Sequence, residues 1–359
     1  LERKFDKLEQ LILGAQYEAE VNEIFDKIQQ QKAFNSFKFD TYRFYLKNAE
    51  TEKTRINVQY VIRQDDSIRN DVFTKNNYSK ELNAKLGFYQ LEHHSFQILG
   101  SYRNLNIIDT SNKNTGISET ILGRLEYNGN FAKNFLVTSL MYELGTGQEQ
   151  KRAYTFVEVD AGLGMYMWVD YNNDNIQQIN EFELALYQDQ KRFIKVFTPT
   201  NEYVNVNYMN LSYSLQINPE NLLRNNKQAW AKFITRFNDQ LSVQMNNRAY
   251  QSLGMKAFNP FTVSSLDASD IINNVVSINN VLYFNRINPK FGIDYATVYN
   301  LGNTLLTYGV EKNDQERHTI KTRWTFISGF TYNMQLFNGH RSYYSGLPDD
   351  RTYKELNLL

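Results

Sequence analysis

The chain has 359 residues, with 39 Lys and Arg against 39 Asp and Glu, so its formal net charge is zero and a basic surface for nucleic acid is not expected. The absence of Cys excludes disulfides, Cys-ligated zinc, iron–sulfur clusters and cysteine nucleophiles. Mean hydropathy is -0.57 and no run of roughly 18 apolar residues occurs, which excludes a transmembrane helix but leaves a β-barrel open, because barrel strands alternate apolar and polar residues.

Residues 1–33 are predicted to form a helical lead-in segment. Two apolar stripes at helical spacing support this: Leu8, Leu11, Ile12 and Ala15, then Val21, Ile24, Phe25 and Ile28. Either the helix packs on the rest of the molecule, or it leads in from a preceding domain. The charged opening Leu1-Glu2-Arg3-Lys4 is no signal peptide, and we expect the sequence to be a fragment of a longer exported chain.

Residues 34–359 are predicted to form an outer-membrane β-barrel region, because from about Phe37 onward the apolar residues recur at every second position. The clearest stretch covers 319–337. Its two faces are Ile320, Trp324, Phe326, Phe330, Tyr332, Met334 and Leu336 on the apolar side, and Thr319, Lys321, Arg323, Thr325, Thr331, Asn333 and Gln335 on the polar side. Ser328-Gly329, inside this stretch, fits either a continuous strand or a tight turn. A further strand is expected at 351–359.

Two β architectures fit this alternation, a transmembrane antiparallel barrel (or a barrel fragment) and a soluble β-sandwich. The barrel is favoured because the runs approach the roughly 9–11 residues that cross a bilayer, and because Tyr, Phe and Trp gather near strand ends. Connections of two sizes also favour it. Short connections are expected at 48–53, 92–94, 128–133 and 288–290, and long ones at 64–78, 107–116, 170–190 and 246–276.

One motif can hold a metal ion. Residues 170–181 read DYNNDNIQQINE and match the twelve-residue calcium loop, within a calcium-like segment at 165–183. The predicted ligands are Asp170, Asn172, Asp174, Ile176 (through its carbonyl oxygen), Gln178 (through water) and Glu181. Asn175 replaces the usual glycine, and Asn tolerates a left-handed backbone better than most residues. The alternative is a polar Asn/Asp turn without metal.

No catalytic or cofactor-binding residue is assigned. Gly162 and Gly164 form a lone G-x-G, for which a β-bulge is favoured over a nucleotide site. No nucleophile, base and orienting group can be assembled, so an enzyme is not expected. Charges on the predicted polar faces are expected to solvate a barrel lumen: Lys85, Arg124, Arg236, Lys321 and Arg323.

The segment 157–183 resembles a stretch of large outer-membrane β-barrel proteins of Bacteroidetes, whose loop reads G-x-G-x-Y-x-W-x-D-x-N-x-D-G-x5-E-F-E. The matching residues are Gly162, Gly164, Tyr166, Trp168, Asp170, Asn172, Asp174, Glu181, Phe182 and Glu183. Met165 and Asn175 depart from the pattern. The resemblance implies an outer-membrane location, a longer original chain and Ca²⁺ at the loop.

The sequence therefore predicts an outer-membrane barrel that acts as a channel, as a transporter or as a component of an export or assembly complex, with a calcium-stabilised external loop. Its expected partners are outer-membrane lipid and other outer-membrane proteins or lipoproteins. The alternative is a soluble, surface-attached β-rich module that binds a protein or a glycan.

Overall fold

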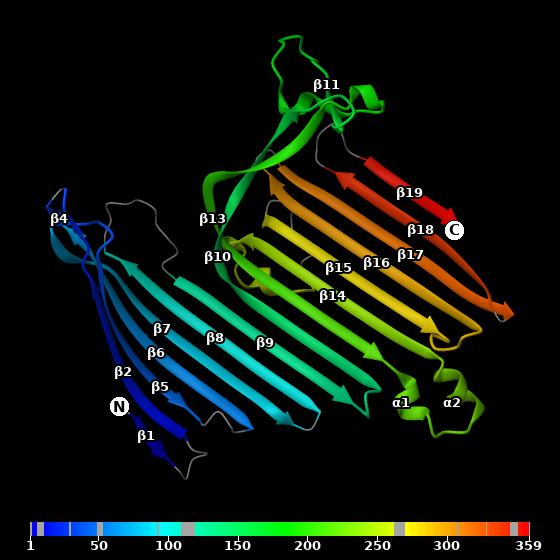
Figure 1. Ribbon diagram of the computed structural model, residues 1–359, viewed down its shortest axis with the longest axis horizontal. Helices are drawn as coiled ribbons and strands as arrows, with labels where there is room; N and C mark the ends of the chain where they lie inside the picture. The colour runs from blue at the N-terminus through cyan, green and yellow to red at the C-terminus, as the bar shows by residue number, and fades with distance from the viewer. Residues whose placement is uncertain are drawn as a thin grey trace. The chain divides into compact units, whose positions relative to one another are not determined.

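The computed structural model describes residues 2–5, 11–28, 30–48, 53–91, 93–108, 119–261, 270–306, 309–327, 329–344 and 351–358. They form an all-β fold of long antiparallel strands with a few short helices, as the alternation predicts (Figure 1). No helix among these residues has the length and apolar character to cross a membrane.

The strands before the candidate metal loop are Glu2–Phe5 (β1), Leu11–Asn22 (β2), Phe25–Asp26 (β3), Gln31–Lys32 (β4), Phe37–Lys47 (β5), Thr54–Arg69 (β6), Val72–Leu91 (β7), His94–Ile107 (β8), Glu119–Phe131 (β9) and Leu136–Glu158 (β10). The later strands are Tyr166–Trp168 (β11), Phe182–Leu184 (β12), Phe193–Ile217 (β13), Phe237–Tyr250 (β14), Ile271–Phe284 (β15), Phe291–Leu306 (β16), Gly309–Ile327 (β17), Phe330–Tyr344 (β18) and Arg351–Leu358 (β19). The helices are Pro219–Leu223 (α1) and Ala229–Ile234 (α2), with 3₁₀ turns at Ile179–Glu181 (η1), Gln188–Gln190 (η2) and Gln251–Phe258 (η3).

The chain divides into two compact units. Unit 1 comprises Leu1–Asn130 and Ser139–Gly147, and unit 2 comprises Phe131–Thr138 and Gln148–Leu359. In unit 1, β1, β2 and β5 to β9 form an antiparallel meander, in which each strand pairs with the next. In unit 2, β13 to β19 form a second antiparallel meander. Within each meander the neighbouring strands follow one another along the chain, except that β3 and β4, which pair with each other, come between β2 and β5.

The prediction of a helix within 1–33 is wrong for the described residues, since 11–22 is strand β2. It pairs with β5 from Ile12 opposite Lys47 to Asn22 opposite Phe37. Leu13, Tyr17 and Val21 also fit a period of two, and pairing with β5 satisfies the backbone groups of this segment. The apolar stripes were compatible with both periods, and the long ladder favours the strand.

Both sheets carry an exposed apolar face. In unit 1, one cross-strand row runs over six strands through Ala15, Phe44, Tyr60, Leu82, Tyr102 and Ile121. The five large side chains of this row are exposed by 38% (Tyr60) to 51% (Phe44). In unit 2, the corresponding row is Leu282, Tyr295, Ile320 and Leu336. A contiguous apolar surface of this kind is unfavourable in water and is expected to contact another apolar phase or surface.

An aromatic chain marks one end of the apolar face of unit 2. Phe237, Phe284, Phe291 and Trp324 come from four successive strands, and neighbouring ring centroids lie 5.0, 6.4 and 5.4 Å apart. The turns β15–β16 and β17–β18 lie at this end of the sheet. The opposite sheet face carries polar residues in register, such as Asp294, Lys321 and Gln335.

Several predicted connections differ from those observed. Residues 64–78 are not a long loop, because β6 and β7 continue to a tight turn at Asn70 and Asp71, both with positive φ (47° and 66°). The loop predicted at 246–276 is shorter, since β14 extends to Tyr250 and β15 begins at Ile271. Of the two alternatives for 319–337, the structure has two strands rather than one, because β17 ends at Ile327 and β18 begins at Phe330. Most of the predicted loop at 107–116 lies outside the described residues.

Candidate functional site

A small aromatic core supports the segment between β10 and β13. Tyr166 of β11, Phe182 of β12 and Phe193 of β13 are buried against one another, with Phe156 and Trp168 packed beside them. The rings of Phe156 and Phe182 stack with centroids 4.1 Å apart. β11 and β12 pair as a short hairpin, so the loop between them is held at both ends.

The two glycines before this hairpin serve the backbone. Gly162 has a φ of +91°, which side chains rarely adopt. Gly164 lies against β13, where an added Cβ would sit 2.5 Å from the Phe193 nitrogen. Their N–H groups donate to the Lys191 carbonyl at 2.9 and 3.0 Å. The glycines thus shape a close turn, and a nucleotide site is not needed to explain them.

The loop between β11 and β12 brings three carboxylates together. One oxygen from each of Asp170, Asp174 and Glu181 lies within 4.8 Å of the others, so the cluster can hold a cation. Glu181 is only 1% exposed, and its Oε2 accepts hydrogen bonds from Trp168 Nε1 (2.9 Å) and the Gln178 N–H (3.2 Å). The two bonds orient the buried carboxylate, and Oε1 carries no hydrogen bond among the described residues.

The other predicted ligands lie around Asp174. Asn172 Nδ2 donates to Asp174 Oδ2 (2.9 Å), and so does Gln178 Nε2 (2.8 Å). The Ile176 N–H donates to Asp174 Oδ1 at 2.7 Å. Asn175, at the usual glycine place, has a φ of 57°, as the interpretation of this position requires. The structure therefore brings the predicted side chains into one loop.

A neighbouring pair lies just outside the cluster. The Tyr171 hydroxyl donates a hydrogen bond to Glu183 Oε1. This hydrogen bond raises the pKa of Tyr171 above its ordinary value, because it stabilises the protonated phenol. Glu183 is thereby engaged by Tyr171 rather than by the three-carboxylate cluster.

The charges predicted to face a lumen all line hollows. Lys321 and Arg323 line one of about 630 Å³ in unit 2, together with Asp294. Lys85 and Arg124 line another of about 450 Å³ in unit 1, where Arg124 Nη1 lies 3.6 Å from Glu143. Arg236 lines a third, of about 360 Å³. Lys85, Arg124, Lys321 and Arg323 lie on strands, whereas Arg236 lies between α2 and β14 and therefore not on a sheet face.

One largely buried ion pair was not predicted. Lys195 Nζ lies 2.6 Å from Glu311 Oε2 and donates to the Tyr343 hydroxyl at 3.2 Å. The same ammonium sits 4.4 Å from the centre of the Tyr154 ring. Lys195 is the third residue of β13, whereas Glu311 belongs to β17 and Tyr343 to β18. Because Lys195 and Glu311 are 116 residues apart, no local sequence signal marks the pair.

No protein-family profile and no curated protein sequence matches the chain. Among solved structures, it is similar to OmpT (in-vitro folded), an outer membrane protein of Vibrio cholerae, at 6% identity over 97% of this chain and 93% of that one, with a TM-score of 0.26. It is also similar to OccAB1 of Acinetobacter baumannii, at 12% identity over 96% and 94% of the two chains, with a TM-score of 0.22. TM-scores of this size carry no weight for fold or function.

Proposed function

We propose that this chain is an outer-membrane β-barrel, or part of one, with a non-enzymatic role as a channel, as a transporter or as a component of an export or assembly complex. The observation that carries the proposal is the exposed apolar row from Ala15 to Ile121 across six strands of unit 1. In water such a row would be an aggregation liability, whereas lipid covers it without cost.

The height of the apolar band supports this proposal. On β7 the apolar residues of this face run from Phe88 to Leu82, and on β17 they run from Phe326 to Ile320. Six residue steps at roughly 3.3 Å each give about 20 Å along the strand before strand tilt is counted, which covers much of the roughly 25 Å apolar band of outer-membrane barrels. The aromatic chain through Trp324 then corresponds to one interfacial girdle.

The polar faces would line water in such a barrel. Hydrocarbon offers no partners for backbone groups, so each sheet would have to be part of a closed barrel, completed by other strands where necessary. Lys85, Arg124, Lys321 and Arg323 would then face the lumen. The expected partners are outer-membrane lipid and other outer-membrane proteins or lipoproteins.

We further propose that the loop at 165–183 binds Ca²⁺. Asp170, Asn172, Asp174, Gln178 and Glu181 would supply side-chain oxygens directly or through water, and Ile176 its carbonyl. Support comes from the converging carboxylates and from the buried, oriented Glu181. Hard oxygen ligands suit Ca²⁺, and the ion would stiffen an external loop.

The membrane assignment can be tested with a matched pair of thiol variants, because the chain has no Cys. Leu82→Cys lies on the apolar face of β7 and Asn83→Cys on its polar face. In isolated membranes, a charged maleimide should label Asn83→Cys, and it should label Leu82→Cys only after detergent extraction. Equal labelling of both thiols in a detergent-free soluble fraction would instead favour the surface-attached binding module.

A gel assay complements the labelling. A closed barrel needs detergent for extraction and migrates faster before heating than after it. Absence of any heat shift in an extract that remains soluble without detergent would contradict the barrel. Ca²⁺ binding is tested separately, since it survives in either architecture.

A further inference from the structure

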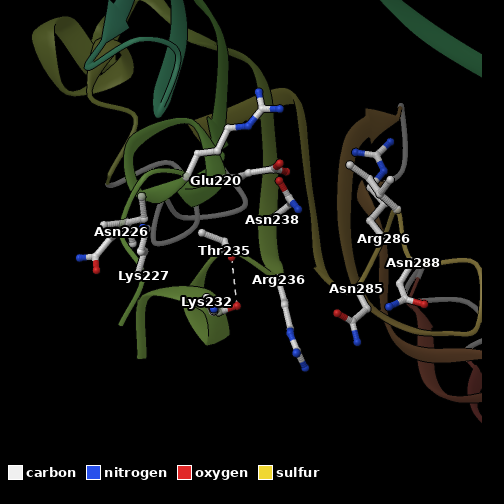
Figure 2. A pocket seen from close by; sticks show the side chains of 13 residues that line it. Glu220, Asn226, Lys227, Lys232, Thr235, Arg236, Asn238, Asn285, Arg286 and Asn288 are labelled. Atoms are coloured by element: carbon white, nitrogen blue, oxygen red, sulfur yellow. Dashed lines mark hydrogen bonds between the residues drawn. The ribbon is translucent and has the colours of Figure 1, made fainter. Parts of the chain in front are cut away.

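Unit 2 carries a basic hollow where the α1–α2 segment meets the β15–β16 turn. The hollow has a volume of about 360 Å³. Five cationic side chains line it, against the single carboxylate of Glu220: Arg224, Lys227, Lys232, Arg236 and Arg286. In Figure 2, Lys227 and Lys232 lie on the side of the helical segment, and Arg286 lies on the side of the β15–β16 turn.

These cations carry no salt bridge among the described residues. Some cations elsewhere do have a carboxylate partner, as in Lys195 with Glu311, Arg248 with Glu149 and Arg103 with Glu81, whereas the one carboxylate in the hollow lies beside five cations. The chain as a whole is electrically neutral, so this concentration of charge is local. Like charges that converge on a concave surface focus a positive potential there, and a bound anion relieves their repulsion.

The donors in the hollow suit phosphate. Three guanidinium groups offer paired N–H donors, which match the geometry of phosphate oxygens, and two ammonium groups add charge. Asn238 and Asn285 line the same hollow with amide groups. The volume fits a phosphate group or a phosphorylated head group, and it is too small for a folded partner.

We infer that this hollow binds a phosphate group. Its surroundings indicate a lipid as one source of that group. Trp230 and Phe233 of α2 are 53% and 54% exposed, and the Phe233 ring lies 5.4 Å from that of Phe237 in the aromatic chain. An exposed apolar helix face beside a basic hollow is the arrangement of an interfacial segment at the level of lipid phosphates. Only the inference of a lipid ligand rests on the proposed membrane function, because binding of inorganic phosphate does not require a membrane.

The test uses the full chain purified in a nonionic detergent. Binding of radiolabelled inorganic phosphate at constant ionic strength forms one arm. The other arm compares binding of the protein to phosphatidylglycerol in doped micelles with its binding to diacylglycerol, which lacks the phosphate. If inorganic phosphate displaces the phosphatidylglycerol, the two bind at the same site. If only one arm shows binding, that arm identifies the source of the phosphate group, and either result supports the inference.

Arg286→Gln and Lys232→Gln should each weaken binding about tenfold, because each removes a charged donor. Lys290→Gln is the matched control, since Lys290 belongs to the same β15–β16 turn and does not line the hollow. It should change affinity less than about twofold, as expected for an exposed charge away from the ligand. Far-UV circular dichroism checks that each variant keeps its strands.

Equal weakening by Lys290→Gln would overturn the inference, because it would reduce binding to general electrostatics. Absence of binding in both arms would overturn it as well. If the protein needs no detergent but still binds inorganic phosphate through Arg286 and Lys232, the membrane proposal fails and the phosphate site stands.

Discussion

Replacing Glu311 with Gln should destabilise unit 2 by about 3 kcal/mol. The side chains of Lys195 and Glu311 are 9% and 22% exposed, so the pair is largely removed from water. Losing one partner of a buried pair costs roughly 3–5 kcal/mol. The lower end applies here, because Lys195 keeps its hydrogen bond to Tyr343 and its contact with the Tyr154 ring. About 3 kcal/mol corresponds to a factor of roughly 150 in the unfolding equilibrium.

The assay is urea unfolding of the purified protein in detergent, followed by tryptophan fluorescence and by the heat shift on a gel. Glu81→Gln is the matched control, since it makes the same substitution in a more exposed pair, Arg103–Glu81, with side chains 43% and 29% exposed. Its cost should stay below about 1 kcal/mol. Lys195→Met combined with Glu311→Gln should recover most of the loss, because no buried charge then remains without its carboxylate.

Two results would refute this reasoning. If Glu311→Gln costs no more than Glu81→Gln, the pair is solvated and does not tie β13 to β17. If the double variant is no more stable than Glu311→Gln alone, the loss comes from packing rather than from the buried charge.

Three further predictions concern the loop and the apolar face. Glu181→Gln should weaken Ca²⁺ binding at least about tenfold, read from Trp168 fluorescence, whereas Glu183→Gln should leave it unchanged because Glu183 pairs with Tyr171. Glu183→Gln should lower the raised pKa of Tyr171 towards its ordinary value. The phenolate absorbance of Tyr171, obtained as the difference from the Tyr171→Phe variant, measures this pKa. The stabilisation that accompanies the raised pKa is complete below the ordinary tyrosine pKa and is lost as the pH rises through the raised pKa. Leu82→Arg should cost about 2–4 kcal/mol in a bilayer and Asn83→Arg less than about 1 kcal/mol, and equal costs in urea unfolding would argue against lipid on the Leu82 face.

The sequence predicts correctly those features that depend on residues close together along the chain, namely the two faces of a strand and the carboxylate cluster of the loop. The alternation over 319–337 gives the same two faces that β17 and β18 present, because the period of a strand follows from its backbone alone. The spacing of Asp170, Asp174 and Glu181 likewise predicted a cluster, since twelve residues suffice to close the loop. Trp168 was part of the same motif, and its bond to Glu181 explains why an aromatic donor stands there.

Other features depended on distant segments and could not be predicted in this way. The 11–22 segment has apolar residues that fit either period, and only its ladder with β5 decides for a strand. The tight turn at Asn70 and Asp71 was hidden because polar residues such as Gln64, Asp65 and Asp66 belong to strand β6 beyond the apolar band. Strands of this fold continue past the apolar face, so polarity alone does not mark a loop.

The candidate metal loop and the buried ion pair meet on one strand. Phe193 packs under the loop against Phe182, and Lys195 follows two residues later, where a strand returns to the same face. Glu181 directly precedes Phe182, so an ion bound by Glu181 would restrain the aromatic core. Through β13, it would also restrain the ion pair and the hydrogen bond that join Lys195 to β17 and β18. We therefore expect Glu311→Gln to cost more in Ca²⁺ than in a chelator. If Glu311→Gln lowers the free energy of unfolding equally in Ca²⁺ and in a chelator, the loop and the sheet unfold independently, and Ca²⁺ stabilises the loop alone.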